Sequence, residues 1–254
     1  MLIATFNVNS VRAHIENILE WLRAFRPDVA LLQEIKCETD AFPKMLFDEA
    51  GYNSAAYGQK SYNGVAILAR DSIEDVETGL PTFKEDPQAR YIEALIGGRL
   101  RVANLYAPNG DPVGTEKFSY KLEWMRRFNE HAAHLARLDE EVVIGGDFNV
   151  IKTDAYAYNP KLFKDSAVMQ PEPRTLFYEA VDKGLADAYA TLNPDKVEYT
   201  YFDYRGNTLA KDNGLVLDYF LTNKNVKLED AGVDKSPRAR PHASDHAPLW
   251  IEIK

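Results

Sequence analysis

With 254 residues, 45% of them hydrophobic, the chain is long enough to bury the core of one large domain over residues 1–254. Its net charge of -9 argues against a general coat for nucleic acid, so any phosphate would be bound by local basic patches or by metal ions. The single cysteine, Cys37, excludes an intramolecular disulfide, and the absence of a long apolar run excludes a membrane-spanning helix.

At the N-terminus the pattern predicts two strands joined by a helix. Apolar residues indicate a buried strand over 2–6, and Asn7 follows it at the strand's mouth. Apolar residues at three- and four-residue spacing predict a helix over 15–25. A second strand over 28–33 places Glu34 at its carboxyl end, next to Asn7 if the two strands are neighbours. Taken alone, this glutamate is more typical of a solvated loop charge than of a site residue.

A run of strands follows, with little helix between them. After a short helix over 43–50, strand-like stretches occupy 52–57, 64–70, 91–96 and 99–106. This rhythm favours antiparallel sheets stacked as a sandwich over a parallel doubly wound sheet.

Two polar residues mark the end of the last of these strands. Tyr106 closes it, and Asn109 lies in the loop that follows. A phenol and an amide are common in turns, and they are also suited to bind a phosphate. An amphipathic helix over 117–138 then leads to the next strand.

The stretch 142–150 carries the most informative polar residues of the chain. Three β-branched residues predict a buried strand, and the glycine pair before Asp147 lets the backbone turn tightly. Asp147 and Asn149 then project from the strand's end. A carboxylate there can deprotonate water or bind a metal ion, and an amide can bind a phosphoryl oxygen. The alternative is an ordinary polar turn after a core strand.

The segment after this strand, over 152–173, is polar and long enough to be a functional surface loop. A helix is predicted over 172–183 and an aromatic strand over 199–204. The buried strand predicted over 215–221 contains Asp218. Because an isolated buried carboxylate costs roughly several kcal/mol, we expect Asp218 to be paired or hydrogen-bonded in an inward-facing polar site.

The last predicted strand, over 249–253, is preceded by Asp245 and His246. An imidazole beside a carboxylate has the chemistry for acid-base catalysis, although surface pairs of this kind outnumber active sites. More informative is the number of polar residues at or beside predicted strand ends, which together form an acid-rich rim able to bind a metal ion. These residues are Asn7, Glu34, Tyr106, Asn109, Asp147, Asn149, Asp218, Asp245 and His246.

With these residues in order, the sequence resembles the exonuclease III family of DNA repair nucleases, the apurinic/apyrimidinic endonucleases. The resemblance runs along the entire chain, and its motifs are specific only as an ordered set. It implies an α/β fold, a four-layer α/β sandwich with two central mixed, mainly antiparallel sheets (DNase I-like). The matching stretches are 6–10, 32–34, 63–67, 106–110, 145–150, 217–218 and 244–248.

The resemblance also implies a role for each residue of the rim. Asp147 would orient or deprotonate the attacking water, Tyr106, Asn109 and Asn149 would hold the phosphate, and Asp218 would orient His246 at the scissile phosphate. Hydrolysis would require Mg²⁺, with Mn²⁺ as a substitute. The implied metal ligands or near neighbours are Asn7, Glu34, Asp147, Asn149, Asp245 and His246.

The implied substrate is double-stranded DNA with abasic sites or 3′ ends, cut 5′ to the abasic site or trimmed in the 3′-to-5′ direction. Tyr201, Leu215 and Leu217 would line the pocket for an extruded abasic sugar. Two departures concern this region, since many members have Arg where Val216 stands, and bacterial relatives often have Thr-Trp-Trp where this chain has 200–202. We expect a cytoplasmic monomer without membrane contact.

Other readings remain open from the residues alone. The same fold serves nonspecific DNases and lipid or inositol phosphate hydrolases, and a non-catalytic DNA-binding homologue is a further alternative. DNA as substrate would require basic residues on the face that carries the site. Those expected there are Arg90, Lys121, Arg126, Arg174, Arg205, Lys211 and Arg238.

Overall fold

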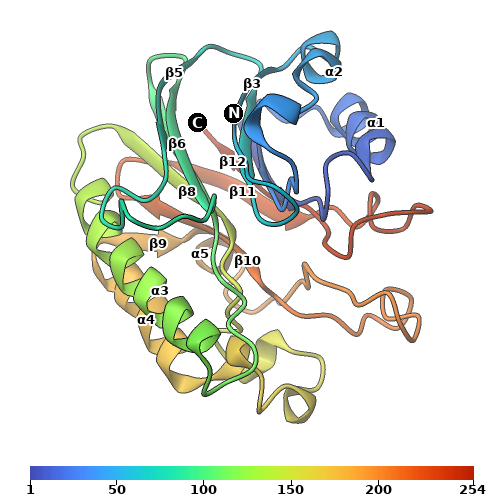
Figure 1. Ribbon diagram of the computed structural model, residues 1–254, viewed down its shortest axis with the longest axis vertical. Coiled ribbons are helices and arrows are strands. Elements are labelled where there is room, and N and C mark those ends of the chain that lie inside the picture. The colour runs from blue at the N-terminus through green and yellow to red at the C-terminus, as the bar shows by residue number, and fades with distance from the viewer.

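The computed structural model describes residues 1–254 and contains two six-stranded sheets that pack face to face between outer layers of helices (Figure 1). The first sheet consists of β1 (Leu2–Asn7), β2 (Val29–Gln33), β3 (Asn53–Tyr57), β4 (Val65–Ala69), β11 (Leu228–Val233) and β12 (Leu249–Ile253). The second consists of β5 (Ile73–Thr78), β6 (Tyr91–Ile96), β7 (Leu100–Tyr106), β8 (Glu141–Asp147), β9 (Leu185–Asp187) and β10 (Asp218–Asn223).

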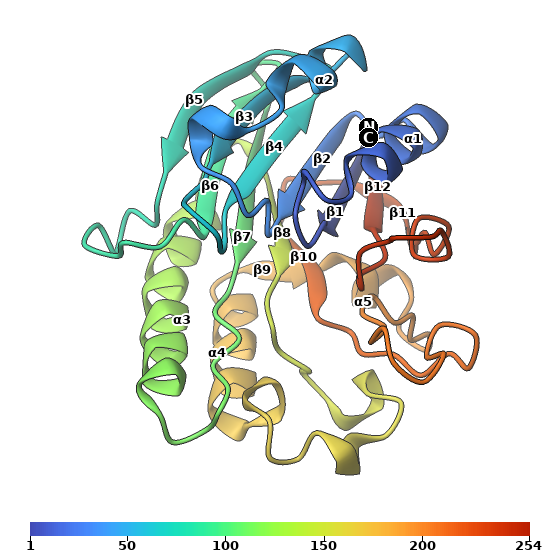
Figure 2. The same ribbon diagram turned by 45° about the vertical axis from the view of Figure 1, so that its right-hand side comes forward.

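Helices cover the outer face of each sheet. Figure 2 shows α1 and α2 on one side of the molecule and α3 and α4 side by side on the other. None of the helices is long and apolar enough to cross a membrane. The helices are α1 (Ile15–Phe25), α2 (Lys44–Glu49), α3 (Glu116–Leu135), α4 (Pro171–Asp182) and α5 (Ala188–Leu192), with 3₁₀ turns η1 (Thr39–Ala41), η2 (Asp154–Tyr156), η3 (Pro160–Leu162) and η4 (Ala167–Met169).

Successive side chains of each strand point to opposite faces of its sheet, and this explains why the molecule has four layers. In β8, Val143 packs between the two sheets, whereas Val142 and Ile144 face α3 and α4. In β1, Ile3 packs between the sheets and Ala4 lies on the α1 side. Three apolar layers therefore separate four layers of secondary structure, as the family resemblance implied.

Both sheets are mixed and mainly antiparallel. The strand orders are β11-β12-β1-β2-β4-β3 and β5-β6-β7-β8-β10-β9. Each sheet contains one parallel pair, β1 with β2 and β7 with β8, and all other neighbours are antiparallel. This confirms the predicted fold class. The carboxyl ends of the parallel strands meet at one rim, where their last residues and the turns after them gather polar side chains.

Some elements differ from the sequence prediction. The stretch 199–204 is not a strand, because its backbone is shared between two partners: Thr200 and Tyr201 both donate to the Leu215 carbonyl, whereas Phe202 donates to Asp245. Leu215 forms only isolated bridges, with Ala157 and Tyr201, so β10 begins at Asp218 instead of Leu215.

Three strands and one helix were absent from the prediction. They are β5, β9, β11 and α5. The edge strand β5 has five exposed residues after Ile73, so it lacks the apolar alternation by which a strand is identified. The strand β9 spans only Leu185–Asp187, which is too short for a periodic pattern.

Candidate active site

Three site residues lie side by side because they occupy the same edge of three neighbouring strands. Asp147 is the last residue of β8, and it is in register with Tyr106 at the end of β7 and with Asp218 at the start of β10. Asp147 and Asp218 are 2% and 1% exposed, so their carboxylates face the interior of the rim. The sequence predicted these residues at strand ends, and pairing of the strands brings them together.

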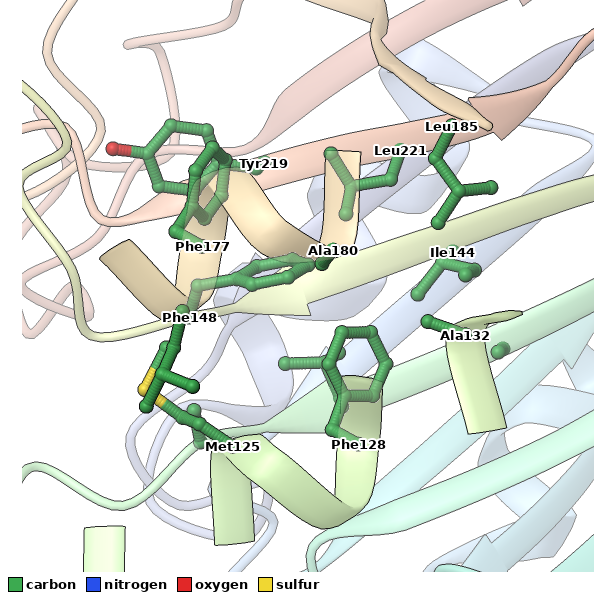
Figure 3. Close-up of a cluster of buried hydrophobic side chains, with 14 of the residues drawn as sticks. Met125, Phe128, Ala132, Ile144, Phe148, Phe177, Ala180, Leu185, Tyr219 and Leu221 are labelled. Carbon is green, nitrogen blue, oxygen red and sulfur yellow. The ribbon is translucent and has the colours of Figure 1, made fainter. Parts of the chain in front are cut away.

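The backbone before and after Asp147 is tightly constrained. Gly146 has φ +151°, and a Cβ atom there would lie 2.0 Å from the Leu105 carbonyl oxygen, so only glycine fits beside β7. The side chain of Phe148 points the other way, into the aromatic cluster around Phe128 and Phe177 (Figure 3). A buried ring on one side and a close backbone contact on the other hold the Asp147 carboxylate in place.

A second carboxylate comes from the first sheet. The Asn7 amide donates to Glu34 Oε1 at 2.9 Å and to Asp147 Oδ2 at 3.0 Å, so one side chain bridges acids of both sheets. Lys36 Nζ lies 2.8 Å from Glu34 Oε2. Burial by itself raises the pKa of Glu34, but the charge and hydrogen bond of Lys36, the hydrogen bond of Asn7 and the charge of His246 together outweigh it, and the net shift is downward.

Asn7 is oriented as a hydrogen-bond donor. Its Oδ1 accepts from the backbone N–H of Asn9 at 3.1 Å, which turns the amide nitrogen toward the two carboxylates. The resemblance placed Asn7 among the metal ligands or their neighbours. In this orientation its amide nitrogen faces the two carboxylates and its oxygen faces the Asn9 backbone.

An imidazole lies against the same acids. His246 Nδ1 is 2.8 Å from Asp218 Oδ2, and Nε2 is 3.8 Å from Asp147 Oδ2. Burial by itself lowers the pKa of His246, but the charges of Asp218 and Asp147 raise it to about 10. The structure therefore pairs the His246 imidazole with two carboxyl groups, and its Nε2 side faces Asp147.

Asp147 itself has a raised pKa, because burial disfavours its charged form and the nearby Asp218 carboxylate adds to this effect. A bound divalent cation would act in the opposite direction. The protonation of Asp147 therefore responds to the charge that binds beside it.

The donor set fits a divalent cation. In the ionised site, the carboxylates of Glu34, Asp147, Asp218 and Asp245 face the cationic groups of Lys36 and His246, which leaves an excess of negative charge. Oδ1 of Asp218 is buried and accepts no hydrogen bond. Asp147, Asp218 and His246 offer ligand atoms within 4.8 Å of one another. Carboxylate oxygens with few nitrogen donors are typical of Mg²⁺ or Mn²⁺ sites.

The amides predicted to hold phosphate lie beside Asp147. Asn149 has φ +50°, and its backbone N–H donates to Asp147 Oδ1 at 2.9 Å. Its side chain accepts from Asn109 Nδ2 at 3.4 Å and donates to the Ala107 carbonyl at 2.9 Å. Burial raises the pKa of Tyr106 well above its ordinary value, and the charges of Glu34 and Asp147 raise it further, so the phenol stays a donor.

Asp245 joins the site from the last loop. Its Oδ1 accepts from Asn9 Nδ2 at 3.3 Å, and Asn9 in turn accepts a hydrogen bond from Lys36. Ser244, its neighbour, donates to the Asn7 carbonyl at 2.7 Å and ties this loop to β1. All nine polar residues expected at one rim are thus brought together.

Two clefts open at this rim. The larger, of about 560 Å³, contains Asn109 and Arg90 in its wall. The other, of about 430 Å³, contains Tyr201, whose ring centroid lies 5.2 Å from that of His246. The remaining residues that line the second cleft are Tyr158, Phe163, Asp203, Arg205, Gly206, Thr208, Lys211, Asn213 and Leu215.

The predicted pocket residues are only partly in this cleft. Tyr201 and Leu215 line it, but Leu217 does not, because its side chain is buried among Ile151, Val168 and Met169. The cleft is completed instead by residues that the sequence did not indicate, Tyr158 and Phe163 among them. Lys36 was also missed, although its position two residues after Glu34 was an available signal.

The chain matches a family model described as the Endonuclease/Exonuclease/phosphatase family over residues 4–246. It is 32% identical to exodeoxyribonuclease III of Haemophilus influenzae, with 98% of each chain covered. A structure of a 3′ phosphatase from Neisseria bound to a product DNA hairpin superimposes with a TM-score of 0.95 at 35% identity, covering 100% of this chain and 99% of the other. A structure of an AP endonuclease from Archaeoglobus fulgidus has a TM-score of 0.95 at 31% identity, with the same coverage.

Proposed function

Because the chain belongs to the endonuclease/exonuclease/phosphatase family, we propose that it is a DNA repair nuclease that cuts double-stranded DNA 5′ to abasic sites and trims 3′ ends. The observation that carries this proposal is the meeting of Asp147, Asp218 and His246 with Glu34 at one rim. The AP endonuclease and the exodeoxyribonuclease III to which the chain is similar support the choice of DNA.

In this proposal Asp147 orients the attacking water and accepts its proton. The amides of Asn109 and Asn149 and the phenol of Tyr106 donate to the non-bridging oxygens, where negative charge increases in the transition state. His246 donates to the scissile phosphate through Nε2, because Asp218 accepts at Nδ1 and fixes the orientation of the ring. Asn7 keeps Glu34 and Asp147 at a constant separation.

We propose Mg²⁺ as the cofactor, with Mn²⁺ as a substitute, held by Glu34 and Asp147 with Asp245 nearby. When bound, the ion supplies charge stabilisation for the phosphoryl oxygens. Glu34 suits this role because its pKa is lowered, so the carboxylate is ionised, and Lys36 is the only protein group that forms a salt bridge with it.

A second candidate activity is removal of a 3′ phosphate from DNA. The Neisseria relative carries the name 3′ phosphatase, and its structure contains a product DNA hairpin. Hydrolysis of a terminal phosphate requires the same groups, since water displaces an alkoxide leaving group in both reactions. The 430 Å³ cleft would accommodate the terminal nucleotide beside His246.

One set of assays distinguishes these activities. The purified protein is incubated with Mg²⁺ and a duplex that carries an abasic site, a recessed 3′ hydroxyl or a 3′ phosphate, with a phospholipid and an inositol phosphate as non-DNA substrates. We expect cleavage of the abasic duplex and release of 3′ nucleotides. Hydrolysis of only the lipid or the inositol phosphate would contradict the proposal. Asp147→Asn is the negative control, because contaminating nucleases would be unaffected by it.

The substrate preference depends on the second cleft. Leu215 stands in its wall, and a larger ring there would narrow the space for a nucleotide with its base. We expect Leu215→Trp to raise the ratio of abasic cleavage to 3′ trimming. An unchanged ratio, with both activities intact, would remove Leu215 from the specificity pocket.

We propose further that residues 1–254 form one catalytic domain that works as a monomer in the cytoplasm. The single cysteine, Cys37, is buried, which suits a reducing compartment. Light scattering of the active protein and fractionation of cells test the two statements, and a stable dimer or a membrane-bound fraction would contradict them.

A further inference from the structure

A buried lysine lies behind the candidate site. Lys121 of α3 was expected on the surface that faces DNA, but its side chain is 0% exposed, so it does not contact a DNA backbone. The prediction for this residue is therefore wrong. Lysine is almost never fully buried unless its amine has partners, because loss of its hydration costs several kcal/mol, roughly. Its position requires an explanation.

The amine of Lys121 has two partners, and both are backbone carbonyls. Nζ donates to Asn149 O at 2.6 Å and to Asn109 O at 3.0 Å. These are the two asparagines whose side chains are proposed to hold the phosphate. Lys121 thus links the loop after β7 to the turn after β8 from inside the protein.

The two segments are also joined on the side that faces the cleft. Asn109 Nδ2 donates to Asn149 Oδ1, at a distance of 3.4 Å. This contact is long, so by itself it holds the amides only weakly. The bonds from Lys121 are shorter and bind both backbones directly, and Asn149 Nδ2 adds a bond to the Ala107 carbonyl at 2.9 Å.

The stem of Lys121 is packed as closely as its amine. A Cβ atom at Gly110 would lie 2.5 Å from Lys121 Cδ and 3.2 Å from the Ala167 side chain. The same loop is held on its other side by Asp111, which accepts from the Ala167 backbone at 2.6 Å and from Ser166 Oγ at 2.7 Å. The loop that carries Asn109 is therefore fixed at several points, with Lys121 at its centre.

We propose that Lys121 is a positioning residue for phosphate hydrolysis: its amine fixes the backbones of Asn109 and Asn149 so that both amides reach the same phosphate. This inference rests on the proposed function. Because displacement of a catalytic group by about 1 Å can cost about 100-fold in rate, we expect loss of the amine to lower kcat by about tenfold to 100-fold, with a smaller effect on KM.

The first test is Lys121→Met, which keeps an unbranched stem and removes the donors. The matched control is Asn129→Leu on the same helix, because Asn129 is buried and its Nδ2 donates to the Leu176 carbonyl at 2.9 Å, on the α4 side of α3. Both variants should lower the melting temperature. Only Lys121→Met should lower kcat, and equal kcat values for the two variants would overturn the proposal.

A double-mutant cycle with Asn149→Ala separates positioning from general damage. If Lys121 acts through Asn149, the double variant should be about as slow as Asn149→Ala alone. Multiplicative losses in kcat would show that the two residues act independently and would overturn the proposal.

Restoration of the amine is the third test. Lys121→Cys in a Cys37→Ala background is unfolded, alkylated with 2-bromoethylamine to give a lysine analogue, and refolded. The parallel sample is alkylated with a propyl halide, which leaves an uncharged stem. We expect kcat to recover only in the first sample. If the propyl sample fails to refold, or recovers equally, Lys121 has a purely structural role or none.

These outcomes are distinct from failure of the proposed function. If the unmodified protein cleaves none of the DNA substrates, the proposed function is wrong. If it cleaves DNA but Lys121→Met keeps its kcat, only the inference about Lys121 is wrong.

Discussion

Replacement of Gly146 by alanine should disable the site without touching any polar group. Gly146 immediately precedes Asp147, and the added Cβ atom would lie 2.0 Å from the Leu105 carbonyl oxygen. Since Cβ atoms essentially never approach closer than 3.0 Å, the end of β8 or of β7 must shift by about 1 Å.

A shift of that size has two consequences. A non-glycine residue at φ +151° adds backbone strain of about 1–3 kcal/mol, which lowers the free energy of unfolding. Displacement of Asp147 by about 1 Å should lower kcat by about 100-fold. The activity loss should therefore exceed what the unfolded fraction explains.

Gly98→Ala is the control for strain alone. Gly98 has φ +62° in the turn between β6 and β7, and nothing lies within 4 Å of an added Cβ. Urea denaturation gives the stability of both variants, and turnover of abasic duplex under conditions where both are folded gives kcat. The reasoning would be refuted if Gly146→Ala kept the kcat of Gly98→Ala.

The remaining predictions concern three single residues and the salt dependence of DNA binding. Asp218→Asn should lower kcat about 100-fold with little change in KM, as we also expect for His246→Ala, since the carboxylate orients the imidazole; a change confined to KM in steady-state kinetics would contradict this. Glu34→Gln should weaken Mg²⁺ binding measured by calorimetry, and unchanged binding would exclude Glu34 as a ligand. Burial by itself raises the pKa of Glu93, but hydrogen bonds from His131 and Tyr91 lower it below 4.5. The lowered pKa means that the ionised Glu93 stabilises the folded protein above pH 4.5, and this stabilisation is lost as the pH falls through the lowered value. Glu93→Gln removes the buried charge, so it should lower the free energy of unfolding by about 3 kcal/mol at pH 7. Urea unfolding should show that this difference shrinks under acid conditions, and a pH-independent difference would contradict the assignment. The affinity for DNA should fall linearly with salt on logarithmic axes, with a slope of a few phosphate contacts, and a flat line would indicate a small phosphate ester as substrate.

Some of the basic residues predicted to face DNA have their charged ends inside the protein. Seven were expected on the DNA-facing surface, yet Lys121 is buried, and Arg174 and Arg238 donate to the backbone carbonyls of Ile151 and Phe202. A Lys or Arg has a long apolar stem, and its sequence neighbours do not reveal whether the charged end reaches solvent or a buried carbonyl.

The sequence by itself determined which polar residues lie at or beside the ends of strands. Strand periodicity and the polar residues after each strand are local features, and they predicted Asn7, Glu34, Tyr106, Asp147 and Asp218 at strand ends. The motifs identified the family because they occur in the same order as in its members, and most of them supply a polar residue to the rim.

Only the tertiary structure decided how those residues meet. The hydrogen bond from Asn7 to Asp147 joins the two sheets across 140 positions of sequence. The burial of Lys121 and of Leu217 depends likewise on loops that pack over them. Such contacts form only when distant segments close on one another, because hydrogen-bond direction and side-chain burial are set by neighbours in space and leave no periodic trace in the chain.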